Sequence, residues 1–273
     1  MNAALTIVVL GGAAALVTGC TDTRPVAATS ALPMPSVAKA CDSVCPAQAH
    51  FIPPNTYHLG ADCGRGCMSI VDATLPGFCM DVLEVSARSY HQCFDAGRCH
   101  GSPGPRGMDQ VVCAEREVAP SDLFAATCLN YDELSEYCAQ AGGYVPTEVE
   151  WEAAARGTDG RTFPWGNDGT LFHTSPGPDW PIRGTTVDVS PFGIADMMAG
   201  VVEWTSTIVA PDLRPGMGFG STREWRALRG APSFPQKDAH ISRRGLELPS
   251  DRLLFDIGGR CAYAAGRAGR ICQ

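Results

Sequence analysis

Three segments of the chain place apolar residues at the spacing of an amphipathic helix. In the third, Thr147 precedes Glu150 by three residues and forms a capping box ahead of an apolar face that contains Trp151. In the first, Ser86 is the expected N-cap, and glycine follows every segment as a stop signal. The pattern therefore predicts helices within SARSYHQCFDAG (86–97), NYDELSEYCAQAGG (130–143) and PTEVEWEAAARG (146–157).

Short apolar runs bounded by turn residues predict strands elsewhere in the chain. These runs are GFCMDVLEV (77–85), VVEWTST (201–207), EWRALRG (224–230) and DIGGRCAY (256–263). The chain also contains 30 Gly and 21 Pro, which favour long irregular connections. Helices early and short strands late, without strict alternation, predict a loop-rich α+β domain.

The charge balance excludes one large class of partner. The formal net charge is −8, and no block of Lys or Arg occurs. Because binding to phosphate backbones needs clustered basic side chains, we do not expect a nucleic-acid partner.

The first residues resemble the export signal of a bacterial lipoprotein. Residues 1–19 are apolar and small and run into LVTGC, which resembles a lipobox that ends at Cys20. We expect a signal peptide at 1–19, a lipidated Cys20, a Pro/Ala/Ser/Thr-rich tether at 20–40 and a folded domain at 41–273. The resemblance implies an extracytoplasmic protein held to the cell-envelope membrane by lipid; the alternative is an uncleaved anchor.

Cysteine usage agrees with export. Of 13 cysteines, 12 remain after Cys20, an even number that predicts disulfides in an oxidising compartment. The pairs CDSVC (41–45) and CGRGC (63–67) also have spacings found in four-thiolate zinc sites, which is the alternative interpretation.

The stretch GIADMMAGVVEWTST (193–207) carries two acids in an apolar run. Ionised carboxylates are rarely buried without a compensating partner, and no basic residue lies near Asp196 or Glu203 in sequence. A cation or a distant basic residue is therefore expected beside them.

Several blocks in a fixed order carry a family resemblance. YCAQAGGYVPTEVEWEAAARG, FPWGN, FGIADMMAGVVEWTS, LRG and IGGRC resemble the formylglycine-generating enzyme, or sulfatase-modifying factor, family over roughly residues 50–263. The resemblance implies a C-type-lectin-like fold. Within it we expect three tryptophans, each with an indole N–H that needs a partner, to pack in the core: Trp151, Trp165 and Trp204.

The resemblance also implies a calcium site. In the family, a stretch like ADMMAGVVEW binds calcium through a side chain at Asp196, carbonyls at Ala199 and Val201, and a carboxylate at Glu203. Calcium prefers such mixtures of hard oxygen ligands. The alternative is that the two acids cap turns or pair with distant arginines. The family's further calcium site is not expected here, because His173 occupies a ligand position.

Two family disulfides behave differently. The resemblance implies a bridge between Cys138 and Cys261. A second family bridge needs cysteines near Ala155 and Arg244, and both halves are absent.

The resemblance fails where catalysis would occur. Active members hold copper(I) with two cysteines in the segment that corresponds to RGAPSFPQKDAHISRRGLE, which contains no cysteine. The thiol positions fall near Gln236 and Ile241, and His240 alone cannot replace two thiolates, so we do not expect copper. The His-rich helical bundle of iron-dependent relatives is also not found.

Three functions follow as hypotheses. The first is a non-catalytic envelope lipoprotein that binds an extracytoplasmic peptide, glycan or other partner, with structural calcium. The alternative is a formylglycine-generating or related oxidase with an altered metal site, and the third is a purely structural surface protein.

Overall fold

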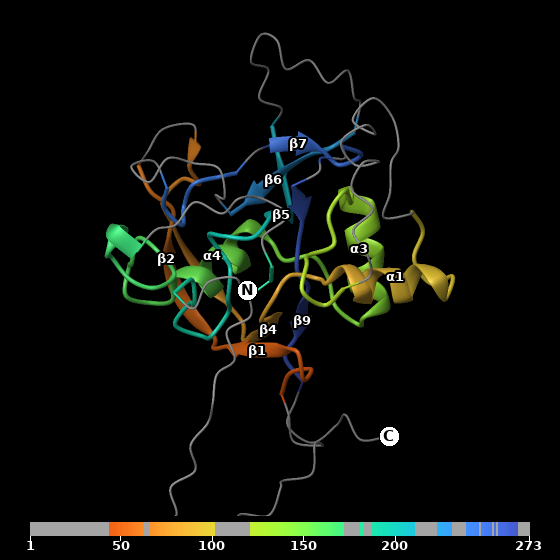
Figure 1. Ribbon diagram of the computed structural model, residues 1–273. Helices are drawn as coiled ribbons and strands as arrows, with labels where there is room; N and C mark the ends of the chain where they lie inside the picture. Colours follow the sequence, from red (N-terminus) through yellow and green to blue (C-terminus); the bar gives the residue numbers. More distant parts are fainter. Residues whose placement is uncertain are drawn as a thin grey trace, which may run out of the picture. The chain divides into compact units, whose positions relative to one another are not determined.

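The computed structural model contains a three-stranded antiparallel sheet with β4 (Phe78–Asp81) at its centre (Figure 1). β1 (Ala49–Ile52) and β9 (Ala262–Ala264) pair with its two edges. The structure describes residues 44–62, 66–101, 121–171, 181–182, 187–210, 223–230, 239–245, 247–252, 254 and 256–266, all within a compact unit that comprises Lys39–Gln273.

A second sheet has the strand order β7-β6-β5-β8. Its strands are β5 (Val202–Val209), β6 (Trp225–Arg229), β7 (Glu247–Pro249) and β8 (Ile257–Gly258). Glu203 lies in the interior of this sheet, opposite Arg229 of β6 and Gly258 of the parallel strand β8. The chain passes from β8 to β9 through Arg260, so this arginine lies where the two sheets meet.

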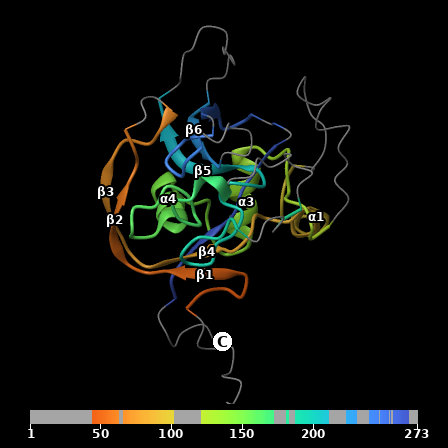
Figure 2. The ribbon, with the colours of Figure 1, turned by 60° about the vertical axis from the view of Figure 1, so that its left-hand side comes forward.

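The remaining strands form an antiparallel hairpin, β2 (Asn55–Leu59) with β3 (Val71–Leu75). Figure 2 shows this hairpin beside α4 (Glu148–Arg156). The Gly60 N–H at the end of β2 donates to Glu152 Oε1 of the helix at 2.7 Å, which joins the hairpin to the core.

The three predicted helices are present, with their ends set by local caps. Ser86 caps α1 (Ala87–Asp95), and Thr147 and Glu150 form the expected capping box of α4. α3 (Tyr131–Gln140) begins with a second capping box, between Asn130 and Glu133. A short 3₁₀ helix, η3, spans Gly169–Leu171. None of the described helices has the length and apolar character of a membrane span.

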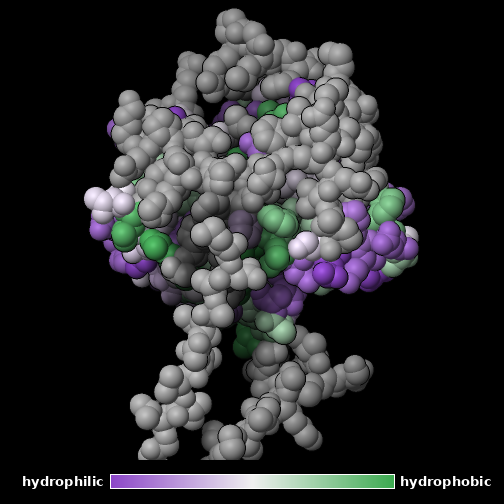
Figure 3. Space-filling model, viewed as in Figure 1, coloured by the Kyte–Doolittle hydropathy of each residue, from purple (hydrophilic) through white to green (hydrophobic). Residues whose placement is uncertain are grey.

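The buried core forms two hydrophobic clusters, one that contains the apolar residues of α4 and one that contains those of β5. Trp151 and Trp204 are fully buried, and their indole N–H groups donate to Glu203 Oε2 and the Leu129 carbonyl. Trp165 is only partly buried and stacks on Phe163, because the loop that carries it lies at the edge of its cluster. In Figure 3 hydrophilic residues gather where Figure 1 draws α1, whose buried positions turn inward.

The strand predictions hold in location but need two corrections. The run expected as one strand over 256–263 is split into β8 and β9, because Gly259 packs against Leu134 and the chain turns from one sheet to the other. The run at 77–85 leaves the sheet after Asp81.

Candidate functional site

A fully buried ion pair joins Arg260 to Glu203. Both side chains have no exposed surface. Arg260 Nε donates to Glu203 Oε1 at 3.0 Å and to Oε2 at 2.9 Å, and its NH2 donates to Oε1 at 2.7 Å. The Trp151 N–H donates to Oε2 at 2.9 Å. Both oxygens of the Glu203 carboxylate are therefore occupied by protein donors.

The remaining donors of Arg260 hold main-chain carbonyls around the pair. Its NH1 group donates to the Asp81 and Val82 carbonyls at 3.2 and 3.1 Å, and NH2 donates to the Ala195 carbonyl at 3.0 Å. The Arg260 guanidinium is thus hydrogen-bonded to the end of β4, to the loop before β5 and to β5 itself. This is the distant arginine that the sequence analysis left open as an alternative.

Several buried carboxyl groups surround Arg260. Glu84 is fully buried with one oxygen 3.9 Å from Arg260 NH2, and neither of its oxygens accepts a hydrogen bond. Burial raises the pKa of Glu84 to about 8, and the nearby charges of Glu203 and Asp196 add to this effect. Burial also raises the pKa of Asp188 to about 7, although its carboxylate accepts N–H groups of the loop.

The loop between Asp188 and β5 curls tightly. Asp188 Oδ2 accepts the N–H groups of Met198 and Ala199 at 2.6 and 2.8 Å. Asp196 has a φ of 57°, and Gly200 has a φ of 70°. A Cβ on Gly200 would collide with Glu84 Oε1, so only glycine permits this approach. The loop and Glu84 are therefore built to lie against each other.

The calcium ligands predicted from sequence can be tested against this geometry. Buried carboxyl groups outnumber buried arginines, which is compatible with a bound metal cation. The two oxygens of Glu84 have no hydrogen-bond partner. No group of three or more His, Cys, Asp or Glu side chains among the described residues is placed to hold a metal ion. Calcium would therefore depend on the carbonyls of Ala199 and Val201 together with Asp196, since Glu203 is already held by Arg260.

One of the two positions expected from the family resemblance to carry a thiol lies in the core. Ile241 is fully buried in the cluster beside α4, and its N–H donates to the Thr162 carbonyl at 2.9 Å. His240 Nε2 lies 3.4 Å from Cys67 Sγ, but Cys67 is in a disulfide. Burial and nearby arginines lower the pKa of His240. Gln236 lies outside the described residues, as do His173 and Cys20.

One of the two positions of the missing second bridge, Arg244, forms an ion pair with α4. Ala155 is buried in α4, and Arg244 donates to both oxygens of Glu148 of the same helix, at 2.7 and 2.9 Å. Burial alone would raise the pKa of Glu148. The hydrogen bonds and positive charges of Arg244 and Arg229 outweigh this effect and hold the pKa below its usual value. Arg244 is thus fastened by charge to the first turn of α4, whereas Ala155 lies near the last residue of the same helix.

Three disulfides lie wholly within the described residues. Cys138 of α3 is bonded to Cys261 ahead of β9, with an S–S distance of 2.02 Å. Cys45 is bonded to Cys79, and Cys93 to Cys99. Because Cys45 and Cys67 are both in disulfides, the four-thiolate zinc alternative is wrong.

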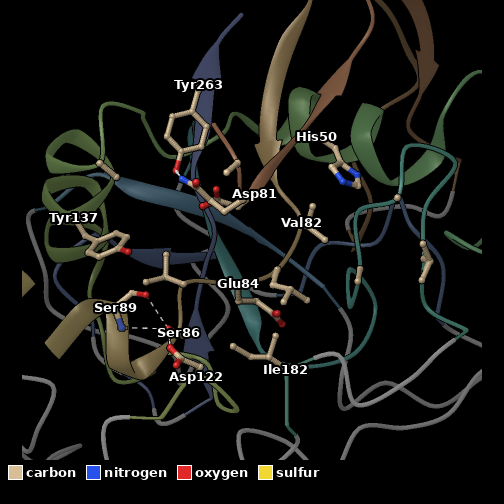
Figure 4. Close-up of a pocket in the computed structure, with 18 residues that line it drawn as sticks. His50, Asp81, Val82, Glu84, Ser86, Ser89, Asp122, Tyr137, Ile182 and Tyr263 are labelled. Atoms are coloured by element: carbon tan, nitrogen blue, oxygen red, sulfur yellow. Dashed lines mark hydrogen bonds between the residues drawn. The ribbon is translucent and has the colours of Figure 1, made fainter. Parts of the chain in front are cut away.

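A cavity of about 1050 Å³ opens beside the Arg260 cluster (Figure 4). Its walls come from β4 and the turn after it, α1, α3 and β9. Apolar side chains of Val82, Leu83 and Ile182 line it together with the polar side chains of Asp81, Tyr137 and Tyr263. Sequence reasoning missed this site, because its residues are far apart in the chain and no motif joins them.

Comparison with known proteins identifies the family of this chain. The family model for the sulfatase-modifying factor enzyme 1-like domain matches residues 37–265. The chain belongs to this family. It is 30% identical over 159 residues to the mouse protein named inactive C-alpha-formylglycine-generating enzyme 2, covering 51% of this chain and 49% of that protein.

An active relative is equally similar. The formylglycine-generating enzyme of Mycobacterium tuberculosis is 32% identical over 162 residues, which cover 50% of this chain and 49% of that enzyme. The chain thus spans about half the length of these curated relatives. The structure of PvdO from Pseudomonas aeruginosa has the same fold, with a TM-score of 0.60 at 19% identity over 81% of this chain and 95% of that one.

Proposed function

We propose that this family member is a cell-envelope lipoprotein whose domain binds an extracytoplasmic ligand and does not oxidise cysteine. One observation carries the proposal: Ile241, at an expected thiol position, is fully buried in the hydrophobic core. Copper(I) selects soft sulfur ligands, and a buried isoleucine supplies none.

The surroundings of Ile241 support the same conclusion. The segment from Ala239 to Gly245 is fixed to α4, because Arg229 NH2 donates to Glu152 Oε2 at 2.6 Å and to the Ile241 carbonyl. Ser242 Oγ also donates to Glu152 Oε1 at 2.9 Å. A segment held this firmly by buried charge serves as scaffold rather than as a site that must admit a substrate peptide.

The family contains both inactive members and enzymes, so membership alone does not decide whether this protein is catalytic. It includes a protein named inactive C-alpha-formylglycine-generating enzyme 2 and one named formylglycine-generating enzyme, at 30% and 32% identity to this chain. The alternative function is therefore an oxidase of protein cysteine with rebuilt metal ligands.

The binding role requires a concave site, and the cavity beside α3 supplies one. Its volume of about 1050 Å³ lies at the upper end of the range of small-ligand pockets. Its mixed apolar and polar walls suit a ligand that is fixed by a few polar contacts. Calcium at the loop of Asp196 would hold one wall of this region, and a lipidated Cys20 would place the domain at the membrane.

The deciding experiment is an oxidation assay. The copper-loaded protein is incubated with oxygen and a sulfatase-type cysteine peptide, with the mycobacterial enzyme as positive control. We expect stoichiometric copper and aldehyde product only in the control. Copper(I) binding together with peptide turnover by this protein would restore the oxidase alternative.

A further inference from the structure

The sulfur of Cys67 lies against an imidazole ring. Cys67 is the last residue of the CGRGC motif and is in a disulfide, and its Sγ lies 3.4 Å from His240 Nε2, within hydrogen-bonding range of sulfur. The ligand-binding function proposed above uses neither residue. Because a neighbouring imidazole favours the thiolate form of a cysteine, this contact bears on how readily the disulfide is reduced.

Main-chain hydrogen bonds hold the contact in place. Residues 66–68 lie antiparallel to residues 242–244, with Cys67 opposite Arg243. Two N–H···O bonds of 3.1 and 2.9 Å, one on each side of this bridge, join the two segments. These bonds do not depend on the disulfide. The Cys67 side chain is therefore kept beside His240 when the S–S bond is cleaved.

The surroundings of this sulfur are basic. The Arg243 side chain lies over the residue before Cys67, since a Cβ on Gly66 would be 3.7 Å from the guanidinium carbon. Burial lowers the pKa of His240, and the positive charges of three nearby arginines lower it further against the opposing charge of Glu152. Burial disfavours either ion, but arginine charges that disfavour an imidazolium favour a thiolate in the same place. Cys67 is thus placed to be a good leaving group.

The bridge between Cys138 and Cys261 has the opposite surroundings. Both of its cysteines are fully buried, in the hydrophobic cluster that contains Leu134 and Trp204. Apolar surroundings disfavour a thiolate and keep reductants away, so this bridge should resist reduction. Cys67 keeps 6% of its surface exposed. The two bridges therefore differ both in access and in the stability of the thiolate that each would release.

We propose that the Cys67 disulfide is redox-active and is opened reversibly by an external dithiol, with His240 stabilising the thiolate that Cys67 becomes. A thiolate of the reductant attacks the other sulfur of the bridge, the S–S bond breaks, and Cys67 leaves with the electron pair. In the tautomer that carries its proton on Nε2, His240 donates to this leaving sulfur.

The second thiol of the reductant then displaces the first from the mixed disulfide. In total the two protein sulfurs gain two electrons and two protons, and the reductant becomes a disulfide. The proposal goes beyond the ligand-binding function and does not rest on it.

The test equilibrates the full chain in detergent with mixtures of reduced and oxidised dithiothreitol in the absence of oxygen. Free thiols are then alkylated, and tandem mass spectrometry gives the reduced fraction of each cysteine. Cys67 should be reduced at a dithiothreitol ratio that leaves Cys138 and Cys261 oxidised. Its equilibrium constant with dithiothreitol should be at least tenfold larger than theirs, which corresponds to about 30 mV.

His240→Leu removes the imidazole and should lower the equilibrium constant of the Cys67 bridge at least tenfold. His240→Gln keeps a side-chain donor and should recover part of this loss. His58→Leu is the matched control, because His58 is an exposed histidine paired with Asp72, and it should leave the constant within twofold of wild type. An unchanged constant for the Cys138 bridge in every variant shows that the fold is intact.

Two results would overturn the proposal. The first is a Cys67 that stays oxidised until Cys138 and Cys261 are reduced. The second is an equal constant for the Cys67 bridge in the wild type and in His240→Leu. The copper assay reports separately on the oxidation of a substrate cysteine, so failure of either proposal leaves the other standing.

Discussion

Arg260 and Glu203 form a fully buried ion pair with three hydrogen bonds, which joins the link between β8 and β9 to the centre of the second sheet. The guanidinium also binds carbonyls of β4 and of the loop before β5. This charged pair therefore links the two sheets. It lies between the cavity and the loop that runs from Asp188 to β5.

Removing the arginine alone should be severely destabilising. Arg260→Met leaves a buried carboxylate without its cation, which costs about 3–5 kcal/mol in the free energy of unfolding. Glu203→Gln combined with Arg260→Met should recover part of this loss, because the uncompensated charge is gone and Gln can still accept the Trp151 N–H. Urea denaturation measures all three free energies.

The control for this prediction is the exposed pair of Arg223 and Asp132, whose side chains are about half accessible. Arg223→Met should cost less than about 1 kcal/mol. A loss of similar size in Arg260→Met and Arg223→Met would contradict the structural role of the buried pair.

The two disulfides of the helical region should differ in their contributions. Cys138–Cys261 closes 123 residues, and Cys93–Cys99 closes 6. In the chain-entropy model, removing the first as a double alanine variant costs about 5 kcal/mol, and removing the second costs about 2 kcal/mol. Thermal and urea unfolding of both variants test this order. A larger loss for the short bridge would mean that local geometry, not loop length, dominates.

The helices were predictable because their signals are local. Ser86 and the pair of Thr147 and Glu150 cap helices from within four residues, so the sequence alone identifies them. β2 and β3 gave no such signal. Most of their residues are exposed, and each strand exists because it pairs with the other, so neither shows a buried apolar pattern.

The site was predictable only in part. The sequence shows that Asp196 and Glu203 need compensation, because acids stand in an apolar run. The compensating Arg260 lies 57 positions from Glu203, and no local pattern connects them. The cavity is more difficult to predict from the sequence, because Asp81, Tyr137 and Tyr263 come together only when the first sheet and α3 have assembled.

Calcium at the Asp196 loop should raise thermal stability by mass action. Glu203 is a poor residue for testing this, because its loss leaves Arg260 unpaired with or without metal. Asp196→Gly removes the ligand and tolerates the φ of 57°. We expect chelation to lower the melting temperature of the wild type and leave that of Asp196→Gly unchanged. Identical wild-type curves with and without chelator, at verified metal content, would refute the calcium site.

Lipidation at Cys20 follows from LVTGC and the tether behind it. Mass spectrometry of membrane-extracted protein should detect a diacylglyceryl-modified peptide that begins at Cys20. Cys20→Ser should release the protein from the membrane fraction or block processing. Recovery of an intact peptide from Met1 to Arg24 in mature protein would exclude this modification.

The buried acids should make the metal-free protein less stable as pH rises. Burial raises the pKa of Glu84 to about 8, far above the usual value near 4.3. The folded state therefore keeps the Glu84 proton where the unfolded state has released it. The resulting stabilisation is fully present below about pH 4 and is lost as pH rises toward 8. Asp188, with a pKa raised to about 7, acts in the same direction.

Urea unfolding in chelator, measured between pH 5 and 8, should thus show a free energy of unfolding that falls with pH. Glu84→Gln cannot ionise, so its slope should be shallower by up to about 1.4 kcal/mol per pH unit, the contribution of one proton. Asp95→Asn, at an exposed position of α1, is the matched control and should keep the wild-type slope. An unchanged slope in Glu84→Gln would show that Glu84 is ionised in the folded protein and that Arg260 compensates it together with Glu203.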